Sequence, residues 1–303
     1  MHAYAILAHK NLDQLHRLVR TLDTGQAAFF IHVDKKADIS PYKQELIDLS
    51  RMPNVEFVKR YHSPWASFGI VQAQRAAMEG ALRAKSQFTH ITLLTGQDYP
   101  IRAPHEIDAF FAAHQGTSFM RFFERRKSKG RRRLLEPPHQ AWRYKNWYFY
   151  FAGRRRRIKI KAKLLRKVGI ERRIPGGLRP VKGWAFFTLS KECAEYASEF
   201  VERNPRYVRF FKHTVVADEY FWHTILVNSA LRETVANVTL RYEPFEENPH
   251  TGHGKVFRKV DLLELRAESS ERFFAKKFDN MVDADILELV DRDLLKATNP
   301  SAL

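Results

Sequence analysis

Two adjacent acids, Asp218 and Glu219, open a helical apolar pattern and could carry acid–base chemistry. Asp218 is a typical helix N-cap because its carboxylate can accept backbone N–H bonds in the first turn. Glu219 would then lie where the helix dipole favours negative charge. A carboxylate fixed at the start of a buried helix can serve as a general base, although capping alone is the commoner role. The pattern leaves both roles open.

A second set of candidates follows apolar runs that are typical of buried strands: His9, Asp34, Trp65 and Asp98. A carboxylate can bond a ribose or a base, and an aromatic ring can stack on one, so the set suits a nucleoside. Each residue taken alone is equally typical of a turn or a cap. The sequence contains no GxGxxG and no Walker A pattern, which argues against a dehydrogenase or a P-loop enzyme.

The predicted strands and helices that must position these residues alternate along the first third of the chain. Periodicity predicts strands at 3–8, 27–33, 55–58 and 90–94, with helices at 12–22, 41–49 and 67–83 between them. Asn11 and Gln14 have the spacing of a capping box before the first helix. This order predicts an α/β fold with a mostly parallel central sheet flanked by helices. Such sheets bind ligands at the carboxyl ends of their strands.

The rest of the chain is less regular. We expect a helix at 107–113, a strand at 118–122, an edge strand at 158–161 and a central strand at 183–189. Ser190 is expected to cap a helix that reaches 201, and a short helix follows Pro205. Beyond the acid pair we expect a strand at 235–242 and helices at 260–265 and 283–295.

The net charge of +18 is concentrated in one segment. Between Arg125 and Lys182 there are 22 Lys or Arg and two acids, a net +20 that leaves −2 for the rest of the chain. Aromatic residues lie between the arginine clusters. We therefore predict a single domain over 1–303, with a nucleotide-binding half (1–122), a basic insert (123–182) and a catalytic and acceptor half (183–303).

Cysteine content and hydropathy indicate the cellular compartment of the protein. The single cysteine, Cys193, excludes an intrachain disulfide framework and lies in an apolar helical setting that indicates packing. The sequence shows no signal peptide and no apolar run near the ~20 residues that span a membrane. We expect a cytoplasmic protein that can lie at the inner face of the membrane.

Seven ordered segments give the chain a resemblance to the core-2/I-branching β-1,6-N-acetylglucosaminyltransferase and peptide O-xylosyltransferase family, glycosyltransferase family 14. They are Ile6–Lys10, Ile31–Lys36, Trp65 with Ser67-Phe68, Leu94–Ile101, Gly183–Leu189, Asp218–Phe221 and Phe274–Asp279. The resemblance implies the GT-A nucleotide-sugar-binding fold. The family lacks the metal-binding Asp-x-Asp of that fold, and here Asp291-Arg292-Asp293 falls in the predicted terminal helix.

The resemblance also implies how a departing nucleoside diphosphate is stabilised without a metal ion. Lys276 and Lys277 match the basic pair that the family places before Phe-Asp, with lysine at 276 where many members have arginine. A lysine loses the bidentate phosphate contact of arginine, so Lys277 is the stronger candidate. The alternative to diphosphate binding is that the two lysines simply lie on a solvent-exposed face of a helix. The family's second diphosphate arginine has no clear match, and Arg258 or Lys255 could take its place.

Glu219 matches the family's catalytic base. The resemblance implies an inverting single displacement, in which Glu219 takes the proton of an acceptor hydroxyl as that oxygen attacks the anomeric carbon. Asp34, Lys36 and Trp65 match positions near the uridine, and Asp98 matches a position beside the donor. Neither a metal ion nor another cofactor is expected.

The donor and acceptor are predicted less directly. Ala185 stands where the xylosyltransferases carry Asp, which favours UDP-GlcNAc, with UDP-xylose next. The acceptor would be a glycan or a lipid-linked sugar, in the synthesis of a surface polysaccharide. In Trp65-Ala66-Ser67 the sequence departs from the Trp-Gly-Gly of many bacterial relatives, so the backbone there could differ.

The basic insert admits three interpretations. Residues 125–182 could hold the enzyme at an anionic membrane surface, where about 1 kcal/mol per basic residue would suffice. They could also form a solvated acceptor-side loop. A nucleic-acid-binding protein that uses the arginines and aromatics is the alternative function. We favour these in the order given and expect no specific nucleic-acid partner, because no nucleic-acid-binding module is recognisable.

Overall fold

The computed structural model describes residues 1–84, 87–123, 126–128, 131–133, 140–150, 158–244 and 254–296. For 126–128 and 131–133 it describes the backbone alone. The arginine run 154–157 and the turn-rich 247–253 lie outside the described residues, as do the side chains of 131–133.

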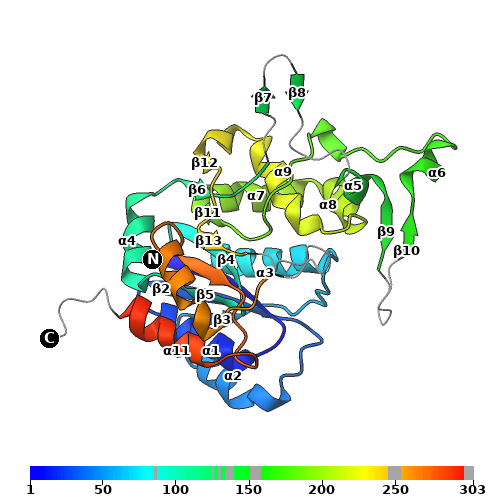
Figure 1. The fold of residues 1–303 in the computed structure, drawn as a ribbon. Coiled ribbons are helices and arrows are strands. Elements are labelled where there is room, and N and C mark those ends of the chain that lie inside the picture. The colour runs from blue at the N-terminus through cyan, green and yellow to red at the C-terminus, as the bar shows by residue number, and fades with distance from the viewer. Residues whose placement is uncertain are drawn as a thin grey trace.

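A seven-stranded sheet in the order β12-β6-β11-β4-β1-β2-β3 forms the centre of the protein (Figure 1). Its strands are β1 (His2–Ala8), β2 (Ala27–Val33), β3 (Val55–Phe57), β4 (His90–Thr95), β6 (Ser118–Phe119), β11 (Thr188–Ser190) and β12 (Val235–Ala236). β1 runs parallel to both β2 and β4, and β2 runs parallel to β3. β11 is antiparallel to both of its neighbours. The mostly parallel sheet predicted from the sequence is therefore confirmed.

Helices cover both faces of this sheet (Figure 1). The α-helices of the described residues are α1 (Leu12–Leu22), α2 (Lys43–Ser50), α3 (Gly69–Arg83), α4 (Pro104–Ala113), α5 (Trp142–Lys145), α6 (Ala162–Arg166), α7 (Lys191–Arg203), α8 (Pro205–Lys212), α9 (Phe221–Val227), α10 (Leu262–Glu268) and α11 (Asp285–Val290), which a π turn (Asp291–Leu295) extends.

The side chains of β1 point alternately to the two faces of the sheet and pack in two separate layers of the core. Ala3 and Ala5 pack in one hydrophobic cluster, which includes residues of α3, α7 and α9. Tyr4 and Ile6 pack in the other, which includes residues of α1, α4 and α11. Side chains on a strand point to opposite faces in turn, so one strand can serve both layers. Cys193 is fully buried in the first layer, as predicted.

A second, three-stranded sheet in the order β13-β14-β5 lies beside the ends of the main strands. It contains β13 (Arg241–Tyr242), β14 (Phe274–Lys276) and β5 (Asp98–Pro100). The predicted strand 235–242 is wrong as a single element, because β12 joins the large sheet and β13 joins the small one. The predicted central strand 183–189 is also shorter than expected: Gly183 forms an isolated bridge with Phe122, and regular pairing begins at Thr188.

The segment 123–182 leaves and rejoins the body at one place, since the Phe123 N–H donates to the Lys182 carbonyl at 2.9 Å. It contains the short strands β7 (Arg126–Ser128) and β8 (Arg131–Arg133) and the antiparallel pair β9 (Trp147–Phe149) and β10 (Ile158–Ile160). β10 is the predicted edge strand. Arg172 ties the segment to the body through the carbonyls of Phe210 and His213, and it also donates to the Asn146 carbonyl within the segment.

The predicted capping box before α1 is wrong, whereas the predicted cap of α7 is right. Asn11 precedes α1 with φ 49°, a left-handed conformation, and its side chain donates to Asp279 instead of capping α1. Gln14 likewise donates to the carbonyls of Gly96 and Phe278. Ser190 caps α7 as expected, because its hydroxyl accepts the Cys193 N–H. Long-range contacts at the strand ends therefore override the local capping pattern before α1.

Candidate active site

Three loops meet at the carboxyl ends of the parallel strands. The Asp34 N–H donates to the Ala8 carbonyl at 2.8 Å, and the Gly96 N–H donates to the Leu7 carbonyl at 2.9 Å. The loop after β14 joins them, since the Phe278 N–H donates to the Gln97 carbonyl at 2.9 Å. The strand order places a switch between β1 and β4, which is where a parallel sheet binds ligands.

Asp34 is buried and fixes the loop that leads to Trp65. Its carboxylate accepts the backbone N–H of Ser63 at 2.7 Å, the Ser63 hydroxyl at 2.5 Å and the Lys36 N–H at 2.8 Å. Burial alone would raise the pKa of Asp34, but these hydrogen bonds hold it below its ordinary value. Asp34 is therefore ionised at neutral pH. The Lys36 side chain is exposed at the mouth of this turn.

His9 is influenced by the charges of both Asp34 and the lysine pair. Desolvation lowers its pKa first, and the positive charges of Lys10, Lys276 and Lys277 lower it further, while Asp34 opposes them. These charges are close enough to act on one imidazole. His9, Asp34, Lys276 and Lys277, matched from separated parts of the sequence, therefore lie around one site.

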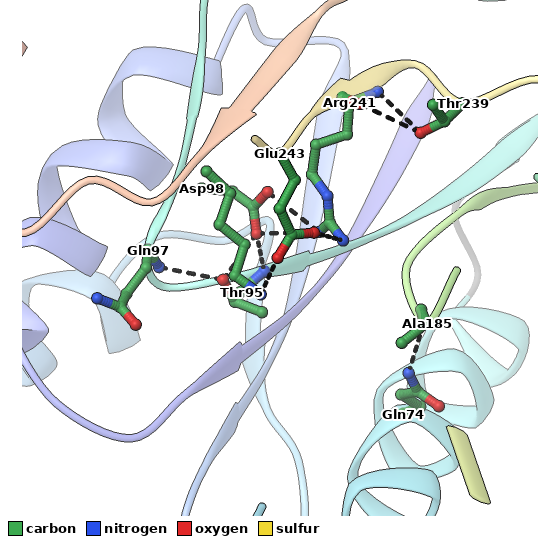
Figure 2. A network of polar contacts seen from close by, with 9 residues as sticks. Gln74, Thr95, Gln97, Asp98, Ala185, Thr239, Arg241 and Glu243 are labelled. Atoms are coloured by element: carbon green, nitrogen blue, oxygen red, sulfur yellow. Dashed lines mark hydrogen bonds and ion pairs between the residues drawn. The ribbon is translucent and has the colours of Figure 1, made fainter. Parts of the chain in front are cut away.

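Figure 2 shows the polar network that supports this site. Asp98 is fully buried, and its carboxylate accepts the Thr95 N–H at 2.6 Å and the Thr95 hydroxyl at 2.7 Å. Arg241 also binds it, with 3.1 Å from Nη1 to Oδ1. The other end of the Arg241 guanidinium donates to Glu243 at 3.1 Å. Asp98 thus holds the loop after β4 and the end of β13 together.

Lys276 stands at the edge of this network. Its Nζ lies 3.5 Å from Glu243 Oε1 and 4.9 Å from the centre of the Phe186 ring. The Arg241 guanidinium lies 4.6 Å from the centre of the same ring. Burial would raise the pKa of Glu243, but Arg241, Lys276 and Lys277 lower it below its ordinary value. Glu243 is therefore the charged partner of Lys276.

Glu219, the candidate base, is held by two cations. Arg143 Nη1 lies 2.5 Å and Lys182 Nζ lies 3.3 Å from Glu219 Oε2. The Glu219 side chain keeps 26% of its surface exposed, so an acceptor can still reach it. Both cations belong to the segment 123–182. The basic insert therefore contributes directly to the site around Glu219.

Asp218 does not cap a helix, contrary to the prediction. Ala217–Glu219 form a 3-10 turn that starts after Val216 at φ 53°, and α9 begins only at Phe221. Asp218 is buried, and its Oδ1 has no hydrogen-bond partner among the described residues. Burial, and then the charge of Glu219, raise the pKa of Asp218 to about 7. The positive charges of Lys276 and Arg143 oppose that rise.

Trp65 projects from a turn that contacts the loop before Asp218. Its surface is 75% exposed, as a stacking platform would be. Ala66 holds φ 62°, and its carbonyl accepts the Val216 N–H at 3.0 Å and the Tyr150 hydroxyl at 2.6 Å. Ala66 thus adopts a left-handed conformation that glycine adopts freely.

Gly183 contacts the Glu219 backbone, and Ala185 contacts Gln74. The Gly183 N–H donates to the Glu219 carbonyl at 2.8 Å. A Cβ at Gly183 would lie 2.2 Å from His223 and 2.3 Å from the Arg121 carbonyl, so this close approach requires glycine. Gln74 donates to the Ala185 carbonyl (Figure 2) and accepts from the Trp222 indole.

Lys255 and Arg258, which were expected to replace the family's second diphosphate arginine, have different surroundings. Lys255 Nζ lies 2.6 Å from both Asp261 and Glu264, so its charge is already paired. Arg258 is exposed, and its backbone N–H donates to Asp261. The Lys255 carbonyl accepts the Lys277 N–H at 3.1 Å.

Sequence reasoning missed four members of the site: Arg143, Lys182, Arg241 and Glu243. Arg143 and Lys182 were hidden in a segment with many cations, and only the fold reveals which of them face Glu219. A signal existed for Arg241, because a charged residue in an apolar strand pattern requires a partner. Within the described ranges, no three His, Cys, Asp or Glu side chains come together as a metal site.

The chain matches a family model and several curated proteins. The family model for the Core-2/I-branching enzyme matches residues 2–267. Human xylosyltransferase 2 is 26% identical over 323 residues, which cover 98% of this chain and 34% of that protein. Drosophila melanogaster xylosyltransferase oxt is 22% identical, over 91% of this chain and 31% of that protein. The chain spans about a third of the length of these curated relatives.

Solved structures with some likeness include S. aureus TarS residues 1–349 in complex with UDP-GlcNAc. It is 14% identical with a TM-score of 0.27, and the match covers 59% of this chain and 50% of TarS. A TM-score this low does not by itself establish a shared fold.

The match over residues 2–267 shows that the chain belongs to the Core-2/I-branching enzyme family. Its α/β sheet with helices on both faces is the GT-A-type architecture expected of that family. No helix of the described chain has the length and apolarity to cross a membrane.

Proposed function

We propose that this glycosyltransferase moves a sugar from a UDP-sugar to an acceptor hydroxyl with inversion and without a metal ion. The observation that carries the proposal is the placement of Glu219 beside Asp218, whose pKa Lys276 also influences. A base and a diphosphate-binding cation are the two groups that such a displacement requires.

In this mechanism the Glu219 carboxylate removes the acceptor O–H proton while the oxygen forms its bond to the anomeric carbon. The bond from that carbon to the diphosphate oxygen breaks, and its electron pair leaves with UDP. Lys276 and Lys277 stabilise the charge that develops there, as a metal ion does elsewhere. Lys276 would exchange its contact with Glu243 for the diphosphate.

Arg143 and Lys182 orient Glu219 and do not themselves transfer the proton. A fixed carboxylate loses little rotational freedom on reaching the transition state. Asp34, Lys36, His9 and Trp65 would bind the uridine side of the donor. Asp98, which is fully buried, would act by supporting the loop after β4.

The donor we favour is UDP-GlcNAc, with UDP-xylose next. Ala185 leaves an uncharged surface where the xylosyltransferase pattern carries Asp. The acceptor would be a glycan or a lipid-linked sugar on the path to a surface polysaccharide. The curated relatives named above are xylosyltransferases, so UDP-xylose remains the second candidate donor.

A transfer assay with each UDP-sugar in excess EDTA tests the proposal. Purified protein is incubated with a glycan or lipid-linked acceptor, and released UDP and the anomeric proton of the product are followed. We expect a β-linked product from an α-linked donor, and transfer by Glu219→Gln lower by about 10²–10⁴-fold. Retention of the α configuration, or a requirement for added metal, would contradict it.

A further inference from the structure

Large apolar side chains are exposed on the segment that follows β10. Leu164 is 62% exposed, Val168 68% and Ile170 49%. Isolated exposed apolar residues are ordinary on protein surfaces, but a group of them in one short segment indicates a contact surface. Leu164 lies in α6, and Val168 lies in the turn that follows it.

This segment is held in a fixed position on the body of the protein. The Ala162 N–H donates to the Asn146 side chain at 2.7 Å, and the Ile170 N–H donates to the Leu165 carbonyl at 3.0 Å. Arg172 then donates to the His213 carbonyl at 2.9 Å. β9, β10 and α6 extend away from the central sheet (Figure 1). The apolar side chains are thus presented outward on an anchored platform.

Exposed cations surround the apolar residues: Lys161, Lys163, Arg166 and Lys167. Between residues 140 and 182 the sequence contains one acid, Glu171, and it pairs with Arg173 at 2.8 Å. We call Lys161, Lys163, Leu164, Arg166, Lys167, Val168 and Ile170 the α6 surface. It combines aliphatic side chains with positive charge and little compensating negative charge.

We propose that the α6 surface binds an anionic lipid membrane. Short apolar side chains can enter the boundary between headgroups and acyl chains while lysine and arginine contact anionic headgroups. Single-stranded nucleic acid fits this surface less well, because bases stack on aromatic rings and the exposed apolar residues here are aliphatic. Tyr148, on the neighbouring strand β9, is buried.

The location of this surface connects it to the active site. The segment 123–182 that carries it also supplies Arg143 and Lys182, which hold Glu219. Binding through α6 would therefore place Glu219 beside a membrane, where lipid-linked acceptors reside. Membrane binding does not depend on the identity of the donor, so it can be tested apart from the transferase proposal.

Vesicle co-sedimentation of the full chain tests the proposal. The vesicles contain either phosphatidylcholine alone or equal parts phosphatidylcholine and phosphatidylglycerol. We expect binding to the anionic vesicles only. Lys163→Ser with Lys167→Ser should weaken it about 25-fold, at about fivefold per basic residue. Leu164→Ser with Val168→Ser should weaken it about tenfold, and this effect should persist at high salt.

Matched controls come from elsewhere on the surface. Leu263, in α10, is 74% exposed, and Arg20 and Lys43 are exposed on α1 and α2. Leu263→Ser, and Arg20→Ser with Lys43→Ser, should bind vesicles like the wild type. UDP binding should be the same in all these variants, which separates membrane binding from loss of folding.

Two outcomes would overturn the proposal. The first is equal binding of the wild type and the α6 variants to anionic vesicles. The second is the absence of vesicle binding together with retention of a single-stranded oligonucleotide at physiological salt, lost in the lysine variant. That second result would assign the surface to nucleic acid.

Discussion

The buried ion pair between Asp98 and Arg241 provides a sharp test, because the family resemblance and the structure give Asp98 different roles. The resemblance places Asp98 beside the donor. In the structure its side chain is 0% exposed, that of Arg241 is 6% exposed, and Thr95 supplies two further hydrogen bonds. A supporting role predicts a loss of stability, whereas a donor contact predicts a loss of affinity.

The expected magnitude follows from burial. Removing one partner of a buried ion pair costs about 3–5 kcal/mol because the other charge is left unpaired. We therefore expect Arg241→Met to lower the free energy of unfolding by about that amount, and Asp98→Asn by somewhat less because its amide oxygen can still accept the Thr95 N–H. The double variant should lose less than the sum of the two, with a coupling of about 2–3 kcal/mol.

Urea denaturation of the four proteins measures this coupling. Arg203→Met is the matched control, because Arg203 pairs with Glu199 at 3.1 Å with 78% and 59% of the two side chains exposed. That control should cost no more than about 1 kcal/mol. The reasoning is refuted if the coupling falls below about 0.5 kcal/mol. It is also refuted if Asp98→Asn keeps wild-type stability and loses UDP-sugar affinity.

Two further predictions concern the residues around Glu219. The pKa of Asp218 rises from 3.8 unfolded to about 7 folded, so the folded protein holds this proton more tightly and stability falls as pH rises between those values. Asp218→Asn should gain stability over the wild type from about pH 4 to about pH 8, by about 4 kcal/mol at most, in urea titrations at each pH. A pH-independent difference would contradict this. Gly183→Ala should lose about 1–3 kcal/mol of stability and most transfer activity, because the new methyl group clashes with His223 and the Arg121 carbonyl. Thermal unfolding measures the first effect, and an unchanged melting temperature would be the contrary result.

The ends of the parallel strands could be predicted from sequence because they depend on local pattern. Apolar runs fixed β1, β2 and β4, and parallel pairing then brought His9, Asp34 and Thr95–Asp98 to one edge. The resemblance added Lys276, Lys277 and Glu219, whose spatial relation no periodicity could reveal. In the structure the charges of both lysines lower the pKa of His9, and that of Lys276 also lowers the pKa of Asp218.

Features set by long-range contacts could not be predicted. Asp218 has the residue type of a cap, but the left-handed Val216 directs the chain into a 3-10 turn and buries the carboxylate. The strand 235–242 has continuous β propensity, yet its two ends pair with different sheets. Arg143 reaches Glu219 from 76 positions away in the sequence, a contact that composition cannot distinguish from those of its basic neighbours.

Isothermal titration with UDP in excess EDTA tests the central claim most directly. The account predicts that the wild type binds UDP without metal, that Lys277→Ala binds at least about tenfold more weakly, and that Glu219→Gln binds as the wild type does. Titration of UDP-GlcNAc, UDP-xylose and UDP-glucose on the same samples then ranks the donors. UDP binding that appears only on addition of a divalent metal, or that is unchanged by Lys277→Ala, would contradict the account.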